Sequence, residues 1–216
     1  YITTADIKEF FDVIDRKRLQ KIICSRLAPD DSLNQLIKDS LNPSVISIDR
    51  YTNRKIPLPS TGEGVAQGSI LSPLFSNIFM SGFDKKVEEL NIKAIRYADD
   101  LAFFSKNKTQ AKKNLTKIAR ILKTTTGLEF HPTGTPKGPR RYLISSWGEY
   151  LGIRFKKFGY SNRWEICPTD EKVKAQIEKI KTTLSLNSNE NLLNRILFLN
   201  RSVFSWLSTY QYAGCT

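Results

Sequence analysis

The sequence contains few of the residues that usually bind transition metals or form nucleophile–base pairs. Its 216 residues include one histidine, His131, and three cysteines, Cys24, Cys167 and Cys215, which are far apart. A zinc site and a serine–histidine–aspartate triad therefore lack their parts. We expect the three thiols to be reduced, as in a cytosol-like compartment, because their number is odd and their spacing matches no metal site.

Long apolar runs are also absent. No run reaches the roughly 18 residues that a membrane span needs, and the opening YITTADIKEF lacks the apolar core of a signal peptide. We therefore expect no membrane partner and no secretion, and a location in a bacterial cytoplasm or in an organelle. Tyr1 is not a methionine and already lies in a predicted strand, so we expect an N-terminal part to be missing. The sequence does not indicate an oligomeric state.

Positive charge is the strongest feature of the composition. Thirty-four Lys and Arg residues stand against 21 Asp and Glu residues, which gives a formal net charge of +13, and the pI is about 9.7. Such a charge favours a polyanionic partner, because each phosphate that is neutralised releases counterions. The composition therefore predicts a nucleic-acid partner, with a merely basic soluble protein as the alternative.

Hydrophobic periodicity predicts strands interleaved with helices. Strands are expected at residues 1–7, 128–130, 142–145, 150–155 and 164–166, with hairpins within residues 45–58 and 92–105. Helices are expected after an Asp15 N-cap, after a Ser32 N-cap, after Ser72-Pro73 as N-cap and first helical residue, and at residues 109–123, 170–184 and 188–212. This order predicts an α+β fold with an antiparallel sheet, and the change of composition near Pro168 predicts a small helical unit after it.

Three aspartates are candidate metal ligands. Asp6 ends the first predicted strand, and Asp99-Asp100 lie at the tip of a hairpin within AIRYADDLAFF. Adjacent carboxylates between apolar strands are costly, because aspartate is a poor strand former and partly buried carboxylates repel each other. Divalent cations remove that penalty, and a pair of them is the usual arrangement for in-line phosphoryl transfer. A solvated turn, in which aspartate is common, is the alternative that the spacing leaves open.

Five segments resemble the ordered motifs of reverse transcriptases. They are residues 6–15 (DIKEFFDVID), 64–77 (GVAQGSILSPLFSN), 97–100 (YADD), 127–130 (GLEF) and 149–153 (EYLGI). The residues of these motifs are most similar to those of the group II intron enzymes and of the retron, CRISPR-associated and defence enzymes of bacteria. The resemblance implies a right-hand polymerase palm at residues 1–167, with helices on one side of its sheet. It also implies an incomplete helical thumb at residues 168–216 and missing N-terminal fingers.

The resemblance implies an RNA-directed DNA polymerase. Such an enzyme adds dNTPs to the 3′ end of a DNA or RNA primer on an RNA template, by two-metal phosphoryl transfer. Two Mg²⁺ ions are implied, with Mn²⁺ as the alternative ion, and Asp6 and Asp99 would be their main ligands. The full set of implied catalytic and metal-binding residues is Asp6, Ile7 through its backbone carbonyl, Asp99 and Asp100.

The same motifs imply contacts with nucleotide, primer and duplex. Phe11 would lie under the sugar and exclude the 2′-hydroxyl group of an rNTP, while Gln67 and Gly68 would contact the dNTP. The primer 3′ end would be held by Tyr150, Leu151 and Gly152. Phosphates of the duplex would be contacted by Lys137, Arg140, Arg141, Lys156 and Lys157, each of which has a solvated surface position as the alternative.

The chain departs from the family's pattern at two positions. Ala66 stands where the second motif usually has proline, and Gly134 stands where the fourth motif often has a lysine that protonates the leaving pyrophosphate. Lys137 and His131 are the nearby candidates for the role of that lysine. The fingers motifs are absent, so this chain alone could be inactive.

Three other functions compete with this interpretation. An RNA-dependent RNA polymerase shares the palm, but Phe11 disfavours it. A catalytically silent nucleic-acid-binding relic is disfavoured because the three acids are present. A nucleotide cyclase would need neither the segment at residues 64–77 nor a basic thumb.

Overall fold

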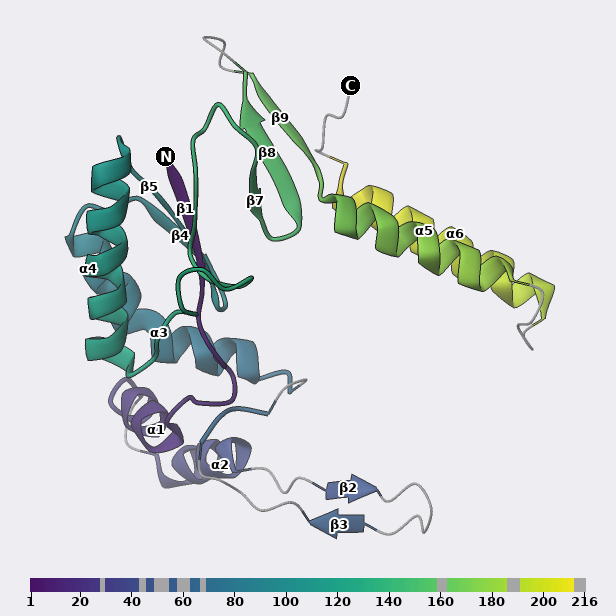
Figure 1. Cartoon of the computed structure of the whole chain (residues 1–216). Coiled ribbons are helices and arrows are strands. Elements are labelled where there is room, and N and C mark those ends of the chain that lie inside the picture. Colours follow the sequence, from purple (N-terminus) through teal and green to yellow (C-terminus); the bar gives the residue numbers. More distant parts are fainter. Residues whose placement is uncertain are drawn as a thin grey trace. The chain divides into compact units, whose positions relative to one another are not determined.

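The computed structural model describes residues 1–27, 30–42, 46–48, 55–57, 63–66, 69–158, 163–185 and 191–211. The chain divides into two compact units, one formed by residues 5–140 and the other by residues 1–4 together with residues 141–216. Both units contain antiparallel strands and helices (Figure 1). This division falls earlier than the boundary after Cys167 that the sequence predicts between palm and thumb, and that boundary stays a prediction.

The unit of residues 5–140 combines helices with a sheet. It contains the end of β1 (Ile2–Asp6), helices α1 (Arg16–Cys24), α2 (Asp31–Leu41), α3 (Ser72–Glu89) and α4 (Lys108–Thr126), and strands β2 (Ile46–Ile48), β3 (Lys55–Pro57), β4 (Ala94–Tyr97) and β5 (Asp100–Phe104). Both predicted hairpins form, because β2 pairs antiparallel with β3 and β4 pairs antiparallel with β5. In the larger sheet, β5 lies between β4 and β1. The predicted α+β class with an antiparallel sheet is therefore confirmed.

A core of large apolar side chains supports β5, an inner strand of this sheet. Phe103 of β5 is fully buried, as are Phe83 of α3 and both Ile118 and Leu122 of α4. Helices α3 and α4 pack against each other beside the hairpin of β4 and β5 (Figure 1). Each such side chain contributes about 1.5–3 kcal/mol on burial, so this core holds β5 and the residue that begins it.

Side-chain caps set where α1 and α2 begin. Asp15 caps α1 as predicted, because its carboxylate accepts a hydrogen bond from the backbone N–H of Arg18. The prediction that Ser32 caps α2 is wrong, since Asp30 is the N-cap. The Asp30 carboxylate accepts from the backbone N–H groups of Ser32 and Leu33, at 2.9 and 3.1 Å. The stronger charged acceptor lies two residues earlier and takes both donors.

The start of α3 differs from the prediction by one residue. Leu71 is the N-cap and makes no side-chain cap, while Ser72 is already helical. The Ser72 hydroxyl donates to the backbone carbonyl of Ala66 in the preceding loop at 2.6 Å. The strand predicted at residues 128–130 is also wrong, because only an isolated bridge between Ile7 and Phe130 forms there.

The second unit contains a separate small sheet and two helices. Strand β6 (Arg140–Tyr142) neighbours β1, and β7 (Gly148–Tyr150), β8 (Ile153–Lys157) and β9 (Trp164–Pro168) form a three-stranded antiparallel sheet. The single strand predicted at residues 150–155 is wrong, because Leu151 and Gly152 turn the chain between β7 and β8 with φ angles of 53° and 76°. The strand predicted at residues 142–145 ends at Tyr142.

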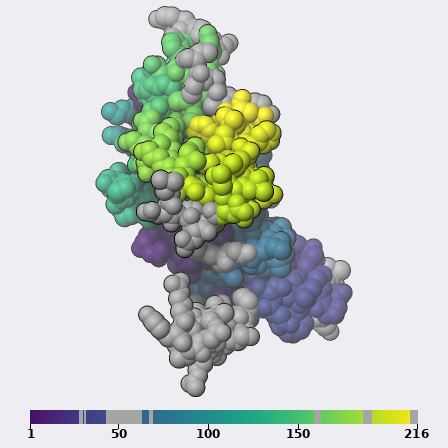
Figure 2. Space-filling view, turned by 90° about the vertical axis from the view of Figure 1, so that its right-hand side faces the viewer, coloured from purple at the N-terminus to yellow at the C-terminus, as the bar shows by residue number. Residues whose placement is uncertain are grey.

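Helices α5 (Asp170–Leu184) and α6 (Leu192–Thr209) lie side by side (Figures 1 and 2). Gln176 of α5 donates to the Ser202 hydroxyl of α6 at 3.3 Å, and Arg195 donates to the carbonyls of Thr183 and Ser185 at 2.8 Å. The helix predicted at residues 170–184 is confirmed to the residue. Within the described part of the chain, no helix is both long and apolar enough to cross a membrane.

Candidate active site

Two strand ends bring the three candidate carboxylates into one region. Asp6 is the last residue of β1, and Asp100 is the first residue of β5, paired with Tyr97 of β4. Ala98 and Asp99 form the turn between β4 and β5, and Ala98 has a φ of 53°. The backbone N–H of Ile7 donates to the carbonyl of Asp99 at 3.1 Å. The exit of β1 is therefore bonded directly to the turn that carries the acids.

The carboxylates act on one another electrostatically. Burial, and then the charge of Asp99, raise the pKa of Asp6 above its usual value. Burial, followed by the charges of Asp99 and Asp6, raises the pKa of Asp100 from 3.8 to about 6. Like charges in a partly desolvated site disfavour ionisation of each other. The three aspartates predicted from sequence thus share one field, which a bound cation would relieve.

The donor set suits hard divalent cations whose coordination shell is completed by a substrate. Among the described residues, no three His, Cys, Asp or Glu side chains form a preassembled metal cage. Mg²⁺ is commonly held by one or two carboxylates together with substrate phosphates rather than by an all-protein cage. The coupled carboxylates of Asp6, Asp99 and Asp100 match that mode of binding, and their oxygen ligands match Mg²⁺ or Mn²⁺.

Two basic residues act on these acids, His131 and Lys137. Both follow Phe130, which forms an isolated bridge with Ile7. The backbone N–H of His131 donates to the carbonyl of Asp6 at 3.0 Å, and the charge of His131 lowers the pKa of Asp6. Lys137 lowers the pKa of both Asp6 and Asp100. Lys137 is thus the basic residue that acts on two of the three acids, although Gly134 occupies the position of the family's lysine.

The loop at residues 132–139 is compact, which explains how it returns Lys137 to the acids. The Thr135 backbone N–H donates to the Pro132 carbonyl at 3.3 Å, and the Gly138 N–H donates to the Thr135 carbonyl at 3.0 Å. A Cβ atom at position 138 would lie 2.2 Å from the Pro132 carbonyl oxygen, so glycine is required there. In the sequence, only the prolines and glycines of residues 132–139 indicated that the chain turns here.

The candidate sugar-selecting residue lies at the edge of the core. Phe11 is half-buried and packs edge-on against the fully buried Phe10, with ring centroids 5.1 Å apart. Phe10 is therefore the core aromatic of the pair. The Phe11 carbonyl accepts a hydrogen bond from the backbone N–H of Val65 at 2.7 Å. This bond ties the backbone of Phe11 to the segment that leads into the predicted nucleotide-binding loop.

Gly64 allows that segment to approach so closely. Its φ is 75°, and a Cβ atom there would lie 2.7 Å from the carbonyl oxygen of Asp12. The Gly64 N–H donates to the Ile14 carbonyl at 2.8 Å, and its own carbonyl accepts from Arg16 Nε at 2.6 Å. Gln67 and Gly68, the dNTP contacts predicted from sequence, lie outside the described residues.

The predicted primer-holding residues belong to the other unit. Tyr150 ends β7 and pairs with Ile153 of β8, and the exposed Leu151 and half-buried Gly152 form the turn between them. Their role stays a prediction. So do the duplex contacts predicted for Arg141, Lys156 and Lys157 in this unit, and for Lys137 and Arg140 in the unit of residues 5–140.

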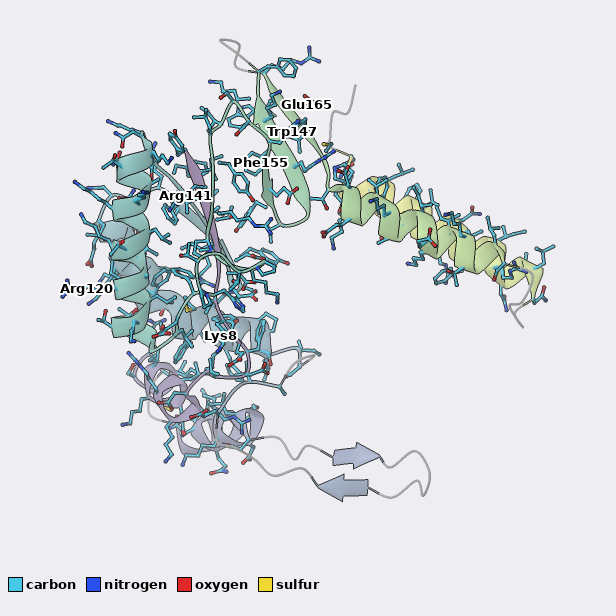
Figure 3. All side chains as sticks on the ribbon, viewed as in Figure 1. Lys8, Arg120, Arg141, Trp147, Phe155 and Glu165 are labelled. Carbon is cyan, nitrogen blue, oxygen red and sulfur yellow. The ribbon has the colours of Figure 1, made fainter. Side chains whose placement is uncertain are left out.

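The second unit contains an aromatic and basic surface of which only Lys156 was predicted from the sequence. The guanidinium of Arg154 lies 5.3 Å, and the ammonium of Lys156 5.8 Å, from the ring centroid of Trp147. Trp147 and Phe155 are labelled in Figure 3, and the Phe155 ring packs edge-on against Tyr142 at 6.4 Å. The signal for this surface is the spacing of Arg154 and Lys156 along β8, which puts both on one face and Phe155 on the other.

Replacing Asp100 with asparagine is expected to stabilise the metal-free protein at neutral pH. The folded-state pKa of Asp100 is raised, so the folded protein binds more protons than the unfolded chain between pH 3.8 and about 6. Wild-type stability therefore falls as pH rises through that window, and the loss persists above it. The full shift corresponds to about 3 kcal/mol, which partial exposure reduces to about 1–2 kcal/mol.

This prediction is checked by urea unfolding in EDTA at pH 4 and at pH 7.5. Asp100→Asn should raise the free energy of unfolding at pH 7.5 and have little effect at pH 4. Asp39→Asn, at an exposed site on α2, is the matched control. A gain that is equal at both pH values would contradict the electrostatic explanation.

The chain is similar to one intron-encoded protein and to solved structures of telomerase. An uncharacterized 91 kDa protein in a cob intron of Schizosaccharomyces pombe is 33% identical over 85 residues, which is 39% of this chain and 10% of that protein. Apo telomerase from Candida tropicalis has a TM-score of 0.54 at 14% identity, covering 98% of this chain and 41% of that one. Telomerase from Candida albicans, in a complex with a telomeric RNA fragment, has a TM-score of 0.53 at 13% identity, covering 98% and 39%.

The two telomerases show the fold, and this chain spans about two-fifths of the length of each. The family comparison adds the evolutionary relationship, because it matches residues 1–153 to the family described as reverse transcriptase (RNA-dependent DNA polymerase). That match includes all three aspartates, the Phe11 segment and the turn at Leu151-Gly152. The chain therefore belongs to the reverse transcriptase family.

Proposed function

We propose that the protein containing this chain is an RNA-directed DNA polymerase that extends a primer 3′ end with dNTPs. The observation that carries the proposal is the group of Asp6, Asp99 and Asp100, whose charges and burial raise the pKa values of Asp6 and Asp100. Such a group is unfavourable in a metal-free protein and favourable in one that binds two divalent cations and a triphosphate.

Each residue has a proposed task in the reaction. Asp6 and Asp99, with Asp100 and the Ile7 carbonyl, would hold two Mg²⁺ or Mn²⁺ ions. When bound, these ions would acidify the primer 3′-hydroxyl and neutralise charge on the leaving pyrophosphate. Phe11 restricts the space under the sugar. Lys137 is the better-supported donor of a proton to pyrophosphate, because its charge acts on both Asp6 and Asp100, whereas His131 acts on Asp6.

The proposed partners are an RNA template, a DNA or RNA primer and dNTPs. The net charge of +13 supports a polyanionic partner, and one similar telomerase is described in a complex with telomeric RNA. We also propose membership of the group II intron and bacterial lineage. The wording of the motifs and the similarity to an intron-encoded protein support this assignment.

Primer extension tests the proposal. The natural protein that contains this chain would be incubated with an RNA template, an annealed DNA primer, Mg²⁺ and dNTPs. The expected result is extension by dNTPs that ceases in EDTA, with rNTPs incorporated poorly. Efficient extension by rNTPs would indicate an RNA polymerase instead. Salt-sensitive binding of the primer–template without any extension would indicate a catalytically silent nucleic-acid-binding protein.

A further inference from the structure

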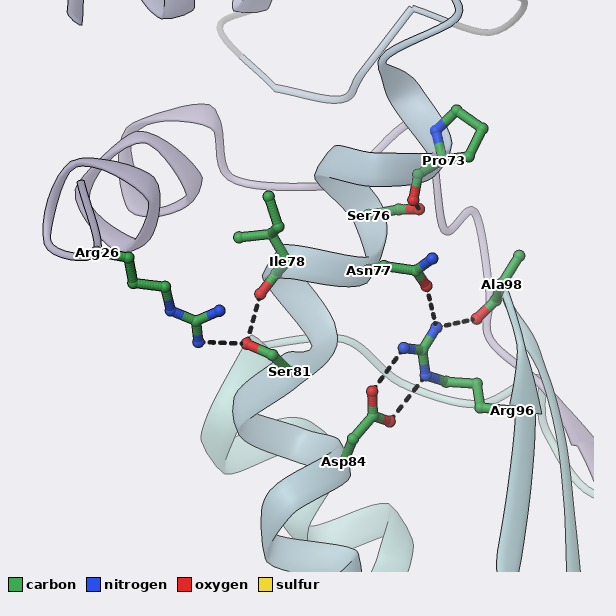
Figure 4. A network of polar contacts seen from close by, with 9 residues as sticks. All are labelled: Arg26, Pro73, Ser76, Asn77, Ile78, Ser81, Asp84, Arg96 and Ala98. Carbon is green, nitrogen blue, oxygen red and sulfur yellow. Dashed lines mark hydrogen bonds and ion pairs between the residues drawn. The ribbon is translucent and has the colours of Figure 1, made fainter.

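Arg96 of β4 contacts both α3 and the turn that carries Asp99 (Figure 4). Its side chain is only 10% exposed. Nε and Nη2 donate to the two carboxylate oxygens of Asp84, at 2.8 and 2.6 Å. Nη1 donates to Asn77 Oδ1 at 3.2 Å and to the carbonyl of Ala98 at 2.9 Å. One planar group therefore joins two residues of α3 to the backbone of the turn.

The bond to Ala98 acts on the peptide plane next to Asp99. The carbonyl of Ala98 and the N–H of Asp99 belong to the same planar peptide unit, so fixing that carbonyl fixes the direction in which the Asp99 Cα leaves the plane. The following peptide plane is fixed as well, because the Asp99 carbonyl accepts from the Ile7 N–H at 3.1 Å. Asp99 is thus held on both sides by hydrogen bonds.

The turn needs such support because its backbone is strained. Ala98 has a φ of 53°, a left-handed conformation that is unfavourable for a non-glycine residue. Without a partner for its carbonyl, the turn could relax to a conformation that suits alanine better and redirects the Asp99 side chain. The bidentate pair with Asp84 orients the guanidinium so that Nη1 reaches this carbonyl.

We propose that Arg96 is a positioning residue for catalysis. It clamps the Ala98–Asp99 peptide to α3 and so keeps the Asp99 carboxylate in the direction that the reaction requires. This inference rests on the proposed function and extends it to a residue that touches neither substrate nor metal. Lysine cannot replace arginine here, because a single ammonium group cannot span both Asp84 oxygens, Asn77 and the Ala98 carbonyl in one plane.

The test compares Arg96→Lys with wild type in the natural protein. The first readout is hydrogen–deuterium exchange of the Ile7 amide in the metal-free protein, because that amide is bonded to the Asp99 carbonyl. We expect its exchange to become about tenfold faster or more, since the turn opens more often. The second readout is Mn²⁺ binding by electron paramagnetic resonance, which should weaken. The third is kcat, which should fall about 10–100-fold with dNTP KM nearly unchanged.

Arg26→Lys is the matched control. Arg26 also donates to α3, through Ser81 Oγ at 2.7 Å, but makes no contact with the turn (Figure 4). It should change none of the three readouts. Asp84→Asn keeps the shape of the anchor and removes its charge, so it should produce smaller changes of the same kind. Asp84→Asn also tests the proposed role of Arg96 if Arg96→Lys does not fold.

Two results would overturn the inference. One is unchanged exchange of the Ile7 amide in both Arg96→Lys and Asp84→Asn. The other is a loss of kcat that Arg26→Lys reproduces, which would indicate a general effect on α3. If the wild-type protein extends no primer, the proposed function fails. The clamp is then judged by the exchange of the Ile7 amide alone, where faster exchange supports it and unchanged exchange refutes it.

Discussion

Asp99→Asn in the intact protein is expected to lower the rate of nucleotide addition by roughly 10³-fold or more, about 4 kcal/mol of transition-state stabilisation. Asp99 is the acid whose charge raises the pKa values of both Asp6 and Asp100, and the turn holds it by hydrogen bonds on either side. Its removal takes away a ligand from the proposed metal site while keeping the size of the side chain. Single-turnover primer extension measures the effect.

Primer–template affinity separates a chemical defect from a folding defect. We expect Asp99→Asn to bind the duplex as tightly as wild type or slightly more tightly, because a negative charge is removed near the phosphates. Asp39→Asn carries the same change of charge on an exposed face of α2 and should extend primers normally. Retention of most activity by Asp99→Asn would contradict the assignment of Asp99 as a metal ligand.

Phe11→Val is expected to relax the choice between dNTPs and rNTPs. Phe11 is half-buried at the edge of the core, and its backbone is held by Val65 and by the tight approach of Gly64. The ring therefore cannot easily move away from a 2′-hydroxyl group. It would clash with the sugar of an rNTP and leave that of a dNTP unhindered. Shortening the side chain should raise kcat/KM for rNTPs about 10–100-fold, or roughly 1.4–2.7 kcal/mol.

The readout is the ratio of kcat/KM values for each dNTP and its matching rNTP. The value for dNTPs should change little, because valine still covers the adjacent core. Phe104→Val, at the exposed end of β5, is the control for the loss of an aromatic side chain in the same unit. An unchanged ratio in Phe11→Val would assign sugar selection to another residue.

Local patterns in the sequence were sufficient for most elements and for the identity of the candidate acids. The helix at residues 170–184, the Asp15 cap and both hairpins depend on interactions between residues that are close in sequence, and each formed as predicted. The Leu151-Gly152 turn was missed, because Leu151 takes a φ of 53° that is rare for leucine and that composition does not reveal. The N-cap predicted at Ser72 was wrong by one residue, because Ser72 is already helical and its hydroxyl donates to Ala66 in the preceding loop.

The sequence by itself determined the type of domain and named the three aspartates, since motif order and residue chemistry are properties of the chain. Only the tertiary structure decided how the acids are supported. Arg96 reaches Asp84 and Asn77, 12 and 19 residues away, and Lys137 acts on Asp6 through a loop whose path depends on Gly138. These contacts join residues distant in sequence. Which partners meet is therefore set by the packing of helices against the sheet, and no local pattern encodes it.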